Sequence, residues 1–283
     1  MRIQWKSHEG EQREAHRWRK GNSRAVVACI HGMSGSGQQF EPLPENMEGI
    51  SFYALDLRGQ GSDPVEERRG MLLDLNNQLR DIDLFLSAVA ADHPGESLFL
   101  MGESMGALLA AAYAAEYSTN KKLQVNGLIL SVPVVELAKP VPKVLRQIMH
   151  FVAKAAPKAR LSPGIFVKSK SLAPKITRDE AYQKALREKP HHISNFTLRF
   201  LVELGDLIEK SQHYAPQIGL PTLVLAAGQD CFVRPEQIAS WFEKIPEGDK
   251  TLHTYAEAYH LLWHDWDKQI VMKDIHRWIT DRI

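Results

Sequence analysis

The sequence predicts an α/β protein with a mostly parallel central sheet and helices on both faces of that sheet. Two patterns support this prediction: short apolar, β-branched segments recur along the chain, and amphipathic helical segments lie between them. Several apolar segments also end in glycine-containing turns, as at 31–37 and 58–61. The chain has 283 residues, of which 44% are hydrophobic, so it is long enough for one large domain with a sizeable core.

The predicted elements follow one another in a regular order. The segment RAVVACIHG (24–32) is expected to be a buried strand, and GISFYALDLRGQG (49–61) repeats the pattern of a strand followed by a turn. The helix expected at 71–92 has an apolar residue every three or four positions, and the one at 105–117 is rich in alanine and can pack closely on a sheet. Further strands are expected at 97–101, 126–133, 220–228 and 250–256, a short helix at 38–48, and a closing amphipathic helix at 261–282.

Residues 134–215 interrupt this alternation, because they contain helical patterns and prolines but no convincing buried strand. We expect a helical insertion between two sheet strands. An open parallel sheet binds its ligands at the carboxyl ends of its strands, and an insertion that leaves the sheet there would cover the site. The predicted organisation is a core of residues 1–133 and 216–283 with a cap of residues 134–215.

The composition indicates which binding partners, which cellular compartment and which cofactors to expect. The net charge of +1 gives no reason to expect a nucleic acid or an acidic partner. The two cysteines, Cys29 and Cys231, form no disulfide framework, and the N-terminal segment lacks an apolar export signal, so a cytoplasmic protein is expected. Histidine pairs such as His191 and His192 lack metal-ligand spacing with acids or cysteines, so no metal site is expected, and no other cofactor is expected either.

The segment 98–117 runs from a predicted strand through Gly-Glu-Ser-Met-Gly into a predicted helix. A serine on such a tight turn presents its hydroxyl away from the backbone, and glycines on both sides let the neighbouring chains approach closely. Ser104 is therefore the candidate nucleophile, with Gly102 and Gly106 as the glycines of the turn. A simple turn is the alternative, since this pentapeptide pattern also arises by chance.

A serine hydroxyl becomes a good nucleophile when an imidazole accepts its proton and an acid orients that imidazole. Two later strand ends supply these groups. Asp230 follows the predicted strand at 220–228, and His260 lies between the last strand and the closing helix. The chain order serine, aspartate, histidine is the one that a nucleophile at a strand-to-helix turn requires.

Each of these candidates has an alternative. Asp230 could instead cap the helix that follows it. His253 and His264 compete with His260, but His253 lies within a predicted strand and His264 within the closing helix, so both are expected to be structural. Asp265 is expected on the solvent-exposed face of that helix.

Acyl transfer also needs hydrogen-bond donors for the developing oxyanion. The backbone N–H of Met105 begins a helix, where the helix dipole favours negative charge. The second predicted donor is the backbone N–H of Met33, in the turn HGMSGSG (31–37). A phosphate-binding loop is the alternative for this turn, but it lacks both the Walker lysine and the G-x-G-x-x-G pattern. His31 is expected to be a structural hydrogen-bonding residue of the turn.

Together, the segments HGMSG, YALDLRGQGSD, GESMG, LVLAAGQDCFV and YAEAYHLLWHD resemble the α/β-hydrolase fold, and most closely its monoacylglycerol lipase and lysophospholipase branch, which includes serine aminopeptidase-like sequences. The resemblance implies a cap between the sixth and seventh core strands. It also implies Ser104 as nucleophile, Asp230 as acid, His260 as base, and Met33 and Met105 as oxyanion donors. The chain departs from many relatives at Ala107, where they have glycine, and at Gln60, where histidine is common.

The predicted cap contains a basic amphipathic helix. Residues 136–175 contain nine lysines or arginines and one acid. Within them, one helical face carries Val144, Leu145, Ile148, Phe151, Val152 and Ala155, while Lys143, Arg146, His150 and Lys154 fall largely elsewhere. The ordinary expectation is that the apolar face packs on the core and the basic face is solvated. The functional hypothesis is transient docking of this helix on an anionic lipid interface.

The expected function is a serine carboxylic-ester hydrolase that forms an acyl-enzyme with a small acyl ester, such as a monoacylglycerol or a lysophospholipid. Serine rather than aspartate at position 104 argues against dehalogenase or epoxide hydrolase chemistry. A thioesterase or a serine peptidase on the same fold is the alternative enzyme. A non-catalytic ligand-binding protein is the alternative from another class. Such a protein usually lacks one of the three catalytic residues, whereas Ser104, Asp230 and His260 are all present here.

Overall fold

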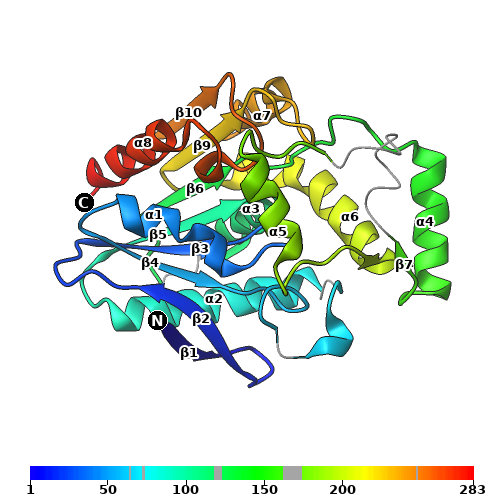
Figure 1. Ribbon diagram of the computed structural model, residues 1–283, viewed down its shortest axis with the longest axis horizontal. Helices are drawn as coiled ribbons and strands as arrows, with labels where there is room; N and C mark the ends of the chain where they lie inside the picture. The colour runs from blue at the N-terminus through cyan, green and yellow to red at the C-terminus, as the bar shows by residue number, and fades with distance from the viewer. Residues whose placement is uncertain (64, 72–73, 118–122, 162–173, 247) are drawn as a thin grey trace.

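The computed structural model describes residues 1–63, 65–71, 74–117, 123–161, 174–246 and 248–283 (Figure 1). Eight strands form one sheet in the order β1–β2–β4–β3–β5–β6–β9–β10. From β4 to β10 the strands of this order run parallel, and β2 and β1 extend the sheet antiparallel at one edge. The predicted α/β fold with a mostly parallel sheet is confirmed.

The strands of this sheet are β1 (Arg2–Lys6), β2 (Gln12–Trp18), β3 (Ala25–Ile30), β4 (Ile50–Leu55), β5 (Ser97–Glu103), β6 (Gly127–Ser131), β9 (Thr222–Ala227) and β10 (Lys250–Tyr255). The α-helices are α1 (Pro42–Asn46), α2 (Leu75–Asp92), α3 (Met105–Tyr117), α4 (Lys143–Ala155), α5 (Glu180–Glu188), α6 (Leu198–Tyr214), α7 (Pro235–Phe242) and α8 (Lys268–Thr280).

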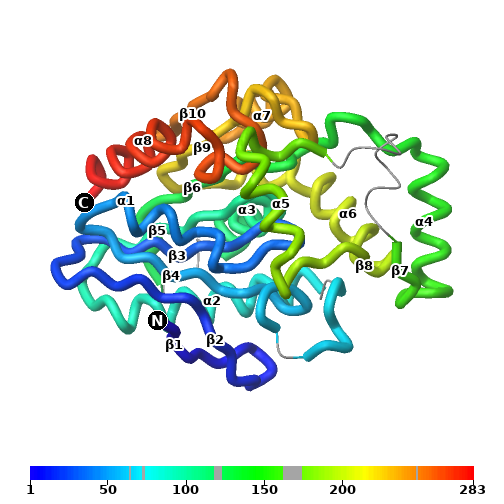
Figure 2. The backbone as a smooth tube through the Cα atoms, in the orientation of Figure 1, coloured from blue at the N-terminus to red at the C-terminus, as the bar shows by residue number. Residues whose placement is uncertain are grey.

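Helices cover both faces of the sheet, and Figure 2 shows the same layers as a backbone trace. Alternate side chains of a strand point to opposite faces, so β3 contributes to two cores. Val26 and Ala28 pack in the core that includes α2, α3, α6 and α7. Val27 and Cys29 pack in the opposite core, which includes α1 and α8.

The order of the strands reverses at β3, which lies between β4 and β5. In a parallel sheet, the loops at such a reversal leave a crevice at the carboxyl ends of the strands. The turn 31–37 follows β3 directly, and Ser104 follows β5 directly. The fold therefore brings these two predicted motifs to one edge of the sheet.

Between β6 and β9 the chain forms α4, α5 and α6, as the helical patterns predicted. It also forms a short antiparallel pair that was not predicted, β7 (Arg160–Leu161) with β8 (Phe196–Thr197). Residues 162–173 of this insertion, which hold two of the nine basic residues of 136–175, lie outside the described residues. The assignment of residues 134–215 to a cap remains a prediction.

Two other features differ from expectation. The β1–β2 hairpin was not predicted, because its strands alternate weakly and bury few apolar side chains, such as Trp5 and Ala15. The helix predicted from residue 71 begins at Leu75, where the Asp74 side chain accepts the N–H of Asn76 and caps it. Residues 72–73 of that prediction lie outside the described residues.

Candidate active site

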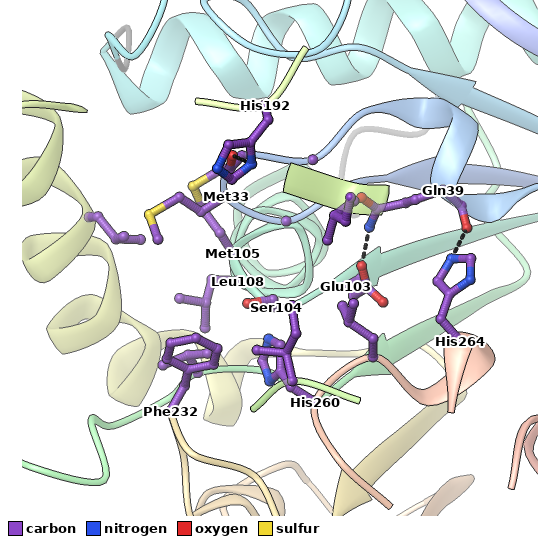
Figure 3. Close-up of a pocket in the computed structure, with 18 of the residues that line it drawn as sticks. Met33, Gln39, Glu103, Ser104, Met105, Leu108, His192, Phe232, His260 and His264 are labelled. Atoms are coloured by element: carbon purple, nitrogen blue, oxygen red, sulfur yellow. Dashed lines mark hydrogen bonds between the residues drawn. The ribbon is translucent and has the colours of Figure 1, made fainter. Parts of the chain in front are cut away.

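A cavity of about 220 Å³ opens at the carboxyl ends of β3 and β5. Figure 3 shows Ser104 and His260 between two differently lined sides of this cavity. One side, here called the apolar side, is formed by Met33, Met105, Leu108 and Phe232. Gln39, Glu103 and His264 lie on the other side, here called the polar side, and Tyr182 stacks on His264 there.

Ser104 occupies a tight turn between β5 and α3. Its φ of +56° lies in the left-handed region, which residues other than glycine rarely adopt. A methyl group on Gly102 would lie 2.3 Å from the Gly106 carbonyl oxygen, and one on Gly106 would lie 2.1 Å from the Ile30 carbonyl oxygen. Space for the crossing backbones therefore explains why glycine occurs on both sides of the serine.

The turn after β3 lies directly against Ser104, since a methyl group on Gly32 would be 3.1 Å from the Ser104 Cβ. The backbone N–H groups of Met33 and Met105 donate to no described residue, and both residues line the cavity. The N–H of Ser34 donates to Gln60 Oε1 over 2.7 Å. Gln60, where many relatives have histidine, thus holds the turn in place.

His260 and Asp230 form a hydrogen-bonded pair beside the cavity. Nδ1 of His260 donates to Asp230 Oδ2 over 2.6 Å, and Asp230 Oδ1 accepts the N–H of Phe232 over 2.8 Å. Burial lowers the pKa of His260, but the charge and the hydrogen bond of Asp230 outweigh that effect and raise the pKa overall, with a contribution from Glu103. Because Nδ1 faces the acid, Nε2 is the nitrogen that is left to accept a proton.

The structure brings Ser104, His260, Met33 and Met105 to the same cavity, with Asp230 behind His260. The Ser104 hydroxyl makes no hydrogen bond to a described residue, including His260. Such catalytic contacts are often long or poorly aligned before a substrate binds. The arrangement can support nucleophilic attack on a carbonyl group, with a base, an orienting acid and two oxyanion donors.

Two other histidines near the cavity, His31 and His264, have structural contacts. His31 uses both nitrogens: Nδ1 donates to the Gly32 carbonyl oxygen over 2.7 Å and Nε2 accepts the N–H of Leu57 over 3.0 Å. His264 Nε2 donates to the Gln39 carbonyl oxygen over 2.7 Å, and burial lowers the pKa of His264 to about 4. Neither imidazole is arranged to act as a second base.

The expectation for Asp265 was wrong, because its carboxylate is buried rather than solvated. It accepts the N–H groups of Tyr259 over 2.7 Å and Trp266 over 2.9 Å, and it pairs with Arg178 Nε over 2.9 Å. Tyr259 precedes His260, so Asp265 anchors the histidine loop. A 3₁₀ turn (Leu262–His264) and an extended Asp265 precede α8, which therefore begins at Lys268 and not at the predicted residue 261. Arg178 is 87 positions away in the sequence, so no local pattern indicated the pair.

Glu103 and Gln39 were also missed. The Glu103 carboxyl is buried, and its Oε2 accepts a hydrogen bond from Gln39 Nε2. Burial raises the pKa of Glu103 to about 8, against the opposing effects of His260 and Gln39. The glutamate was visible within Gly-Glu-Ser-Met-Gly, but the sequence did not show that its side chain would be enclosed beside the cavity.

No group of three or more histidine, cysteine, aspartate or glutamate side chains among the described residues could hold a metal ion. No helix in the described ranges combines the length and apolar character needed to cross a bilayer.

A mostly parallel sheet, a serine at a strand-to-helix turn, and an acid–histidine pair on later loops define the class of α/β-hydrolases. The family model described as "Serine aminopeptidase, S33" matches residues 21–267, and the chain belongs to this family. It is a hydrolase of the carboxylesterase and lipase kind. The resemblance seen in the sequence is therefore confirmed at the level of the family.

The chain is 26% identical over 266 residues to a monoacylglycerol lipase of Mycolicibacterium smegmatis, a match that covers 92% of this chain and 89% of the relative. It is 24% identical over 260 residues to the phospholipase YtpA of Bacillus subtilis, covering 90% of this chain and 95% of that protein. A soluble variant of the Saccharomyces cerevisiae monoglyceride lipase, solved with a substrate analog, has the same fold. Its TM-score is 0.80 at 23% identity, over 99% of this chain and 94% of that one.

Proposed function

We propose that this chain is a serine carboxylic-ester hydrolase in which Ser104 is the nucleophile, His260 the base and Asp230 the acid. The observation that supports this best is the 2.6 Å contact between His260 and Asp230 beside a cavity that Ser104 also lines. The raised pKa of His260 fits an imidazolium that Asp230 stabilises during the reaction.

The proposed reaction is acyl transfer in two steps. The Ser104 oxygen attacks the ester carbonyl carbon while His260 Nε2 takes the hydroxyl proton. The backbone N–H groups of Met33 and Met105 then bind the oxyanion. Each donor lowers the activation free energy by about 3 kcal/mol. His260 returns the proton to the leaving alcohol, and water, activated by the same histidine, hydrolyses the acyl-enzyme.

The proposed substrates are single-chain acyl esters, with the acyl chain on the apolar side of the cavity. The cavity is narrow for a drug-sized ligand, and its apolar wall extends from Leu108 to Phe232. Monoacylglycerols and lysophospholipids fit this arrangement. The similar proteins named as a monoacylglycerol lipase and a phospholipase support the same substrate class.

The direct test is a panel of p-nitrophenyl esters of increasing chain length together with a fluorophosphonate probe. We expect ester hydrolysis, and mass spectrometry should find the probe on Ser104. The variant Ser104→Ala should be inactive and unlabelled, whereas Ser87→Ala, on the exposed side of α2, should behave as wild type. A thioester and an amino-acid p-nitroanilide test the alternative enzymes. An inert wild type with Ser104 unlabelled would instead support a non-catalytic binding protein.

We also propose that α4 docks on an anionic lipid surface. The ordinary expectation, that its apolar face packs on the core, was wrong for the described residues. The exposed fraction is 74% for Phe151, 68% for Val144 and 53% for Ile148. Among the described residues, the helix instead contacts α6, where Ala153 packs with Val202, and none of them covers its outer apolar side chains.

The charges around α4 favour lipid as that partner. Arg146 pairs with Glu209 of α6 over 2.7 Å, and His150 Nε2 lies 3.2 Å from Asp206 Oδ1 of the same helix. Lys143 and Lys154 remain exposed at the two ends of the helix. Exposed apolar side chains flanked by exposed cations suit the boundary between anionic headgroups and acyl chains.

The variant Phe151→Ser should bind vesicles of phosphatidylcholine and phosphatidylglycerol about 30-fold more weakly, because it loses about 2 kcal/mol of apolar transfer energy. Co-sedimentation measures this change. Leu84→Ser, an exposed apolar residue on α2, is the matched control and should bind as wild type. Equal partitioning of wild type and Phe151→Ser would rule out docking through α4.

A further inference from the structure

Glu103 has different surroundings from the other buried acidic residues. The acidic side chains buried in the described part of the chain are Asp56, Asp63, Asp81, Glu103 and Asp265. The four aspartates each pair with an arginine or a histidine, at distances of 2.7 to 3.6 Å. Glu103 has no such pair among the described residues, and its carboxyl accepts a hydrogen bond from the neutral side chain of Gln39. A carboxyl buried without a cation destabilises the fold, so its position next to Ser104 indicates a function.

Hydrogen bonds hold the Glu103 carboxyl in place. Glu103 ends β5 and directly precedes Ser104. Its Oε2 accepts from Gln39 Nε2, and the Gln39 carbonyl oxygen accepts from His264 Nε2 over 2.7 Å, as the dashed lines in Figure 3 show. Gln39 follows the turn that carries one oxyanion donor, and His264 follows His260 by four residues. The carboxyl is therefore fixed relative to both loops that border the serine.

His260 is the group on which a charge at Glu103 acts. Burial has the largest effect on both pKa values, since it raises that of Glu103 and lowers that of His260. After the larger effects of Asp230, the Glu103 charge raises the pKa of His260, and the His260 charge in turn lowers that of Glu103. During the reaction His260 holds the Ser104 proton and is positively charged. The cation that Glu103 lacks at rest therefore forms near it in the transition state.

The oxyanion that forms at the same time lies farther from Glu103. Figure 3 shows Met33 and Met105, whose N–H groups are the proposed oxyanion donors, on one side of Ser104 and Glu103 on the other. Ser104 and His260 lie between these two sides. Because charges interact more strongly the closer they are, a carboxylate at Glu103 stabilises the imidazolium more than it destabilises the oxyanion.

We propose that Glu103 is a positioning residue whose carboxylate supplies a second negative charge, in addition to that of Asp230, to stabilise the protonated form of His260. The inference rests on the proposed ester hydrolysis and adds a residue to it. The proton moves from Ser104 Oγ to His260 Nε2 and then to the leaving alcohol, and no bond to Glu103 forms or breaks. Hydrolysis should therefore be fastest when both carboxyl groups are ionised.

The ionisation of Glu103 gives the proposal its pH dependence. The titratable groups that face it are His260, Tyr182 and Cys29, and burial together with the Glu103 charge raises the pKa of the last two. Burial lowers the pKa of the nearby His264 to about 4, so that imidazole stays neutral. The pKa of Glu103 is raised to about 8, so its charge appears as the pH rises through that value. The value of kcat/KM should rise first as His260 loses its proton and again, about fivefold, as Glu103 ionises.

The pH profile of kcat/KM for a p-nitrophenyl ester, from about pH 6 to about pH 9.5, tests the proposal. Labelling of Ser104 by fluorophosphonate counts the active sites in each preparation. Glu103→Gln can still accept the Gln39 hydrogen bond but carries no charge, so its profile should lack the second rise. Gln39→Met removes a hydrogen bond that lowers the pKa of Glu103, so the midpoint of the second rise should move to higher pH. Glu203→Gln removes another carboxyl with a raised pKa, outside the cavity lining, and should keep the wild-type profile.

A purely structural role for Glu103 would scale the rates of Glu103→Gln by one factor and leave the shape of the profile unchanged. A single rise in the wild type, or a second rise that persists in Glu103→Gln, would overturn the proposal while ester hydrolysis stands. If circular dichroism shows that Glu103→Gln is unfolded, Gln39→Met decides, and an unshifted midpoint would overturn the proposal. No hydrolysis by the wild type, with Ser104 unlabelled, would mean instead that the proposed function is wrong.

Discussion

Asp230→Asn is expected to lower kcat/KM for p-nitrophenyl esters about 10⁴-fold while the protein stays folded. The reason lies in the two oxygens of Asp230. Oδ1 accepts the N–H groups of Phe232 over 2.8 Å and Val233 over 3.4 Å, and Oδ2 accepts the His260 Nδ1–H. The amide oxygen of an asparagine will therefore turn to the backbone N–H groups, and its NH₂ group will face His260.

That NH₂ group is a donor, so His260 Nδ1 must become an acceptor and the ring proton moves to Nε2. A protonated Nε2 cannot accept the Ser104 proton. Steady-state kinetics and circular dichroism, measured together, check the result. Asp249→Asn, which changes an exposed carboxylate paired with Arg282, is the matched control and should keep wild-type kinetics. Wild-type activity in Asp230→Asn would show that another acid serves His260.

Gly106→Ala is expected to destabilise the protein by about 3 kcal/mol and to lower Tm by roughly 8 °C. The new methyl group would lie 2.1 Å from the Ile30 carbonyl oxygen and 2.6 Å from that of His31, so the end of β3 must move. Because Met33 follows this strand end, ester hydrolysis should fall as well. Thermal unfolding followed by calorimetry measures the change in stability.

Gly205→Ala provides the comparison for this substitution. Gly205 lies within α6, and nothing is within 4 Å of an added methyl group. Alanine is the better helix former, so this variant should gain about 0.5–1 kcal/mol. If Gly106→Ala were as stable as Gly205→Ala, close backbone contact would not be the reason for glycine at position 106.

The fold could be predicted from the sequence because its signals are local. Apolar strands such as 25–30 and the alanine-rich α3 are readable within a dozen residues. The order of Ser104, Asp230 and His260 was readable too, since each follows a recognisable strand. The β1–β2 hairpin was not, because an edge hairpin with few buried apolar residues gives little periodicity.

The parts that were missed depend on which segments meet in space. The apolar stripe of α4 predicted an amphipathic helix correctly, but periodicity does not reveal whether a neighbour covers that stripe. Asp265 looked like a surface acid until Arg178 and the Tyr259 N–H were placed beside it. Glu103 lay inside the motif that was identified, yet its enclosure follows only from packing.

The anchoring of Arg178 by Asp265 has a consequence for engineering. One buried carboxylate fastens Arg178, two residues before α5, to the backbone N–H of Tyr259, the residue before His260. Pulling the start of α5 outward to admit bulkier esters would also displace His260. Redesign for larger substrates should leave these contacts intact. It should instead replace Leu186, which lies farther along α5 and lines the same cavity, with a smaller residue.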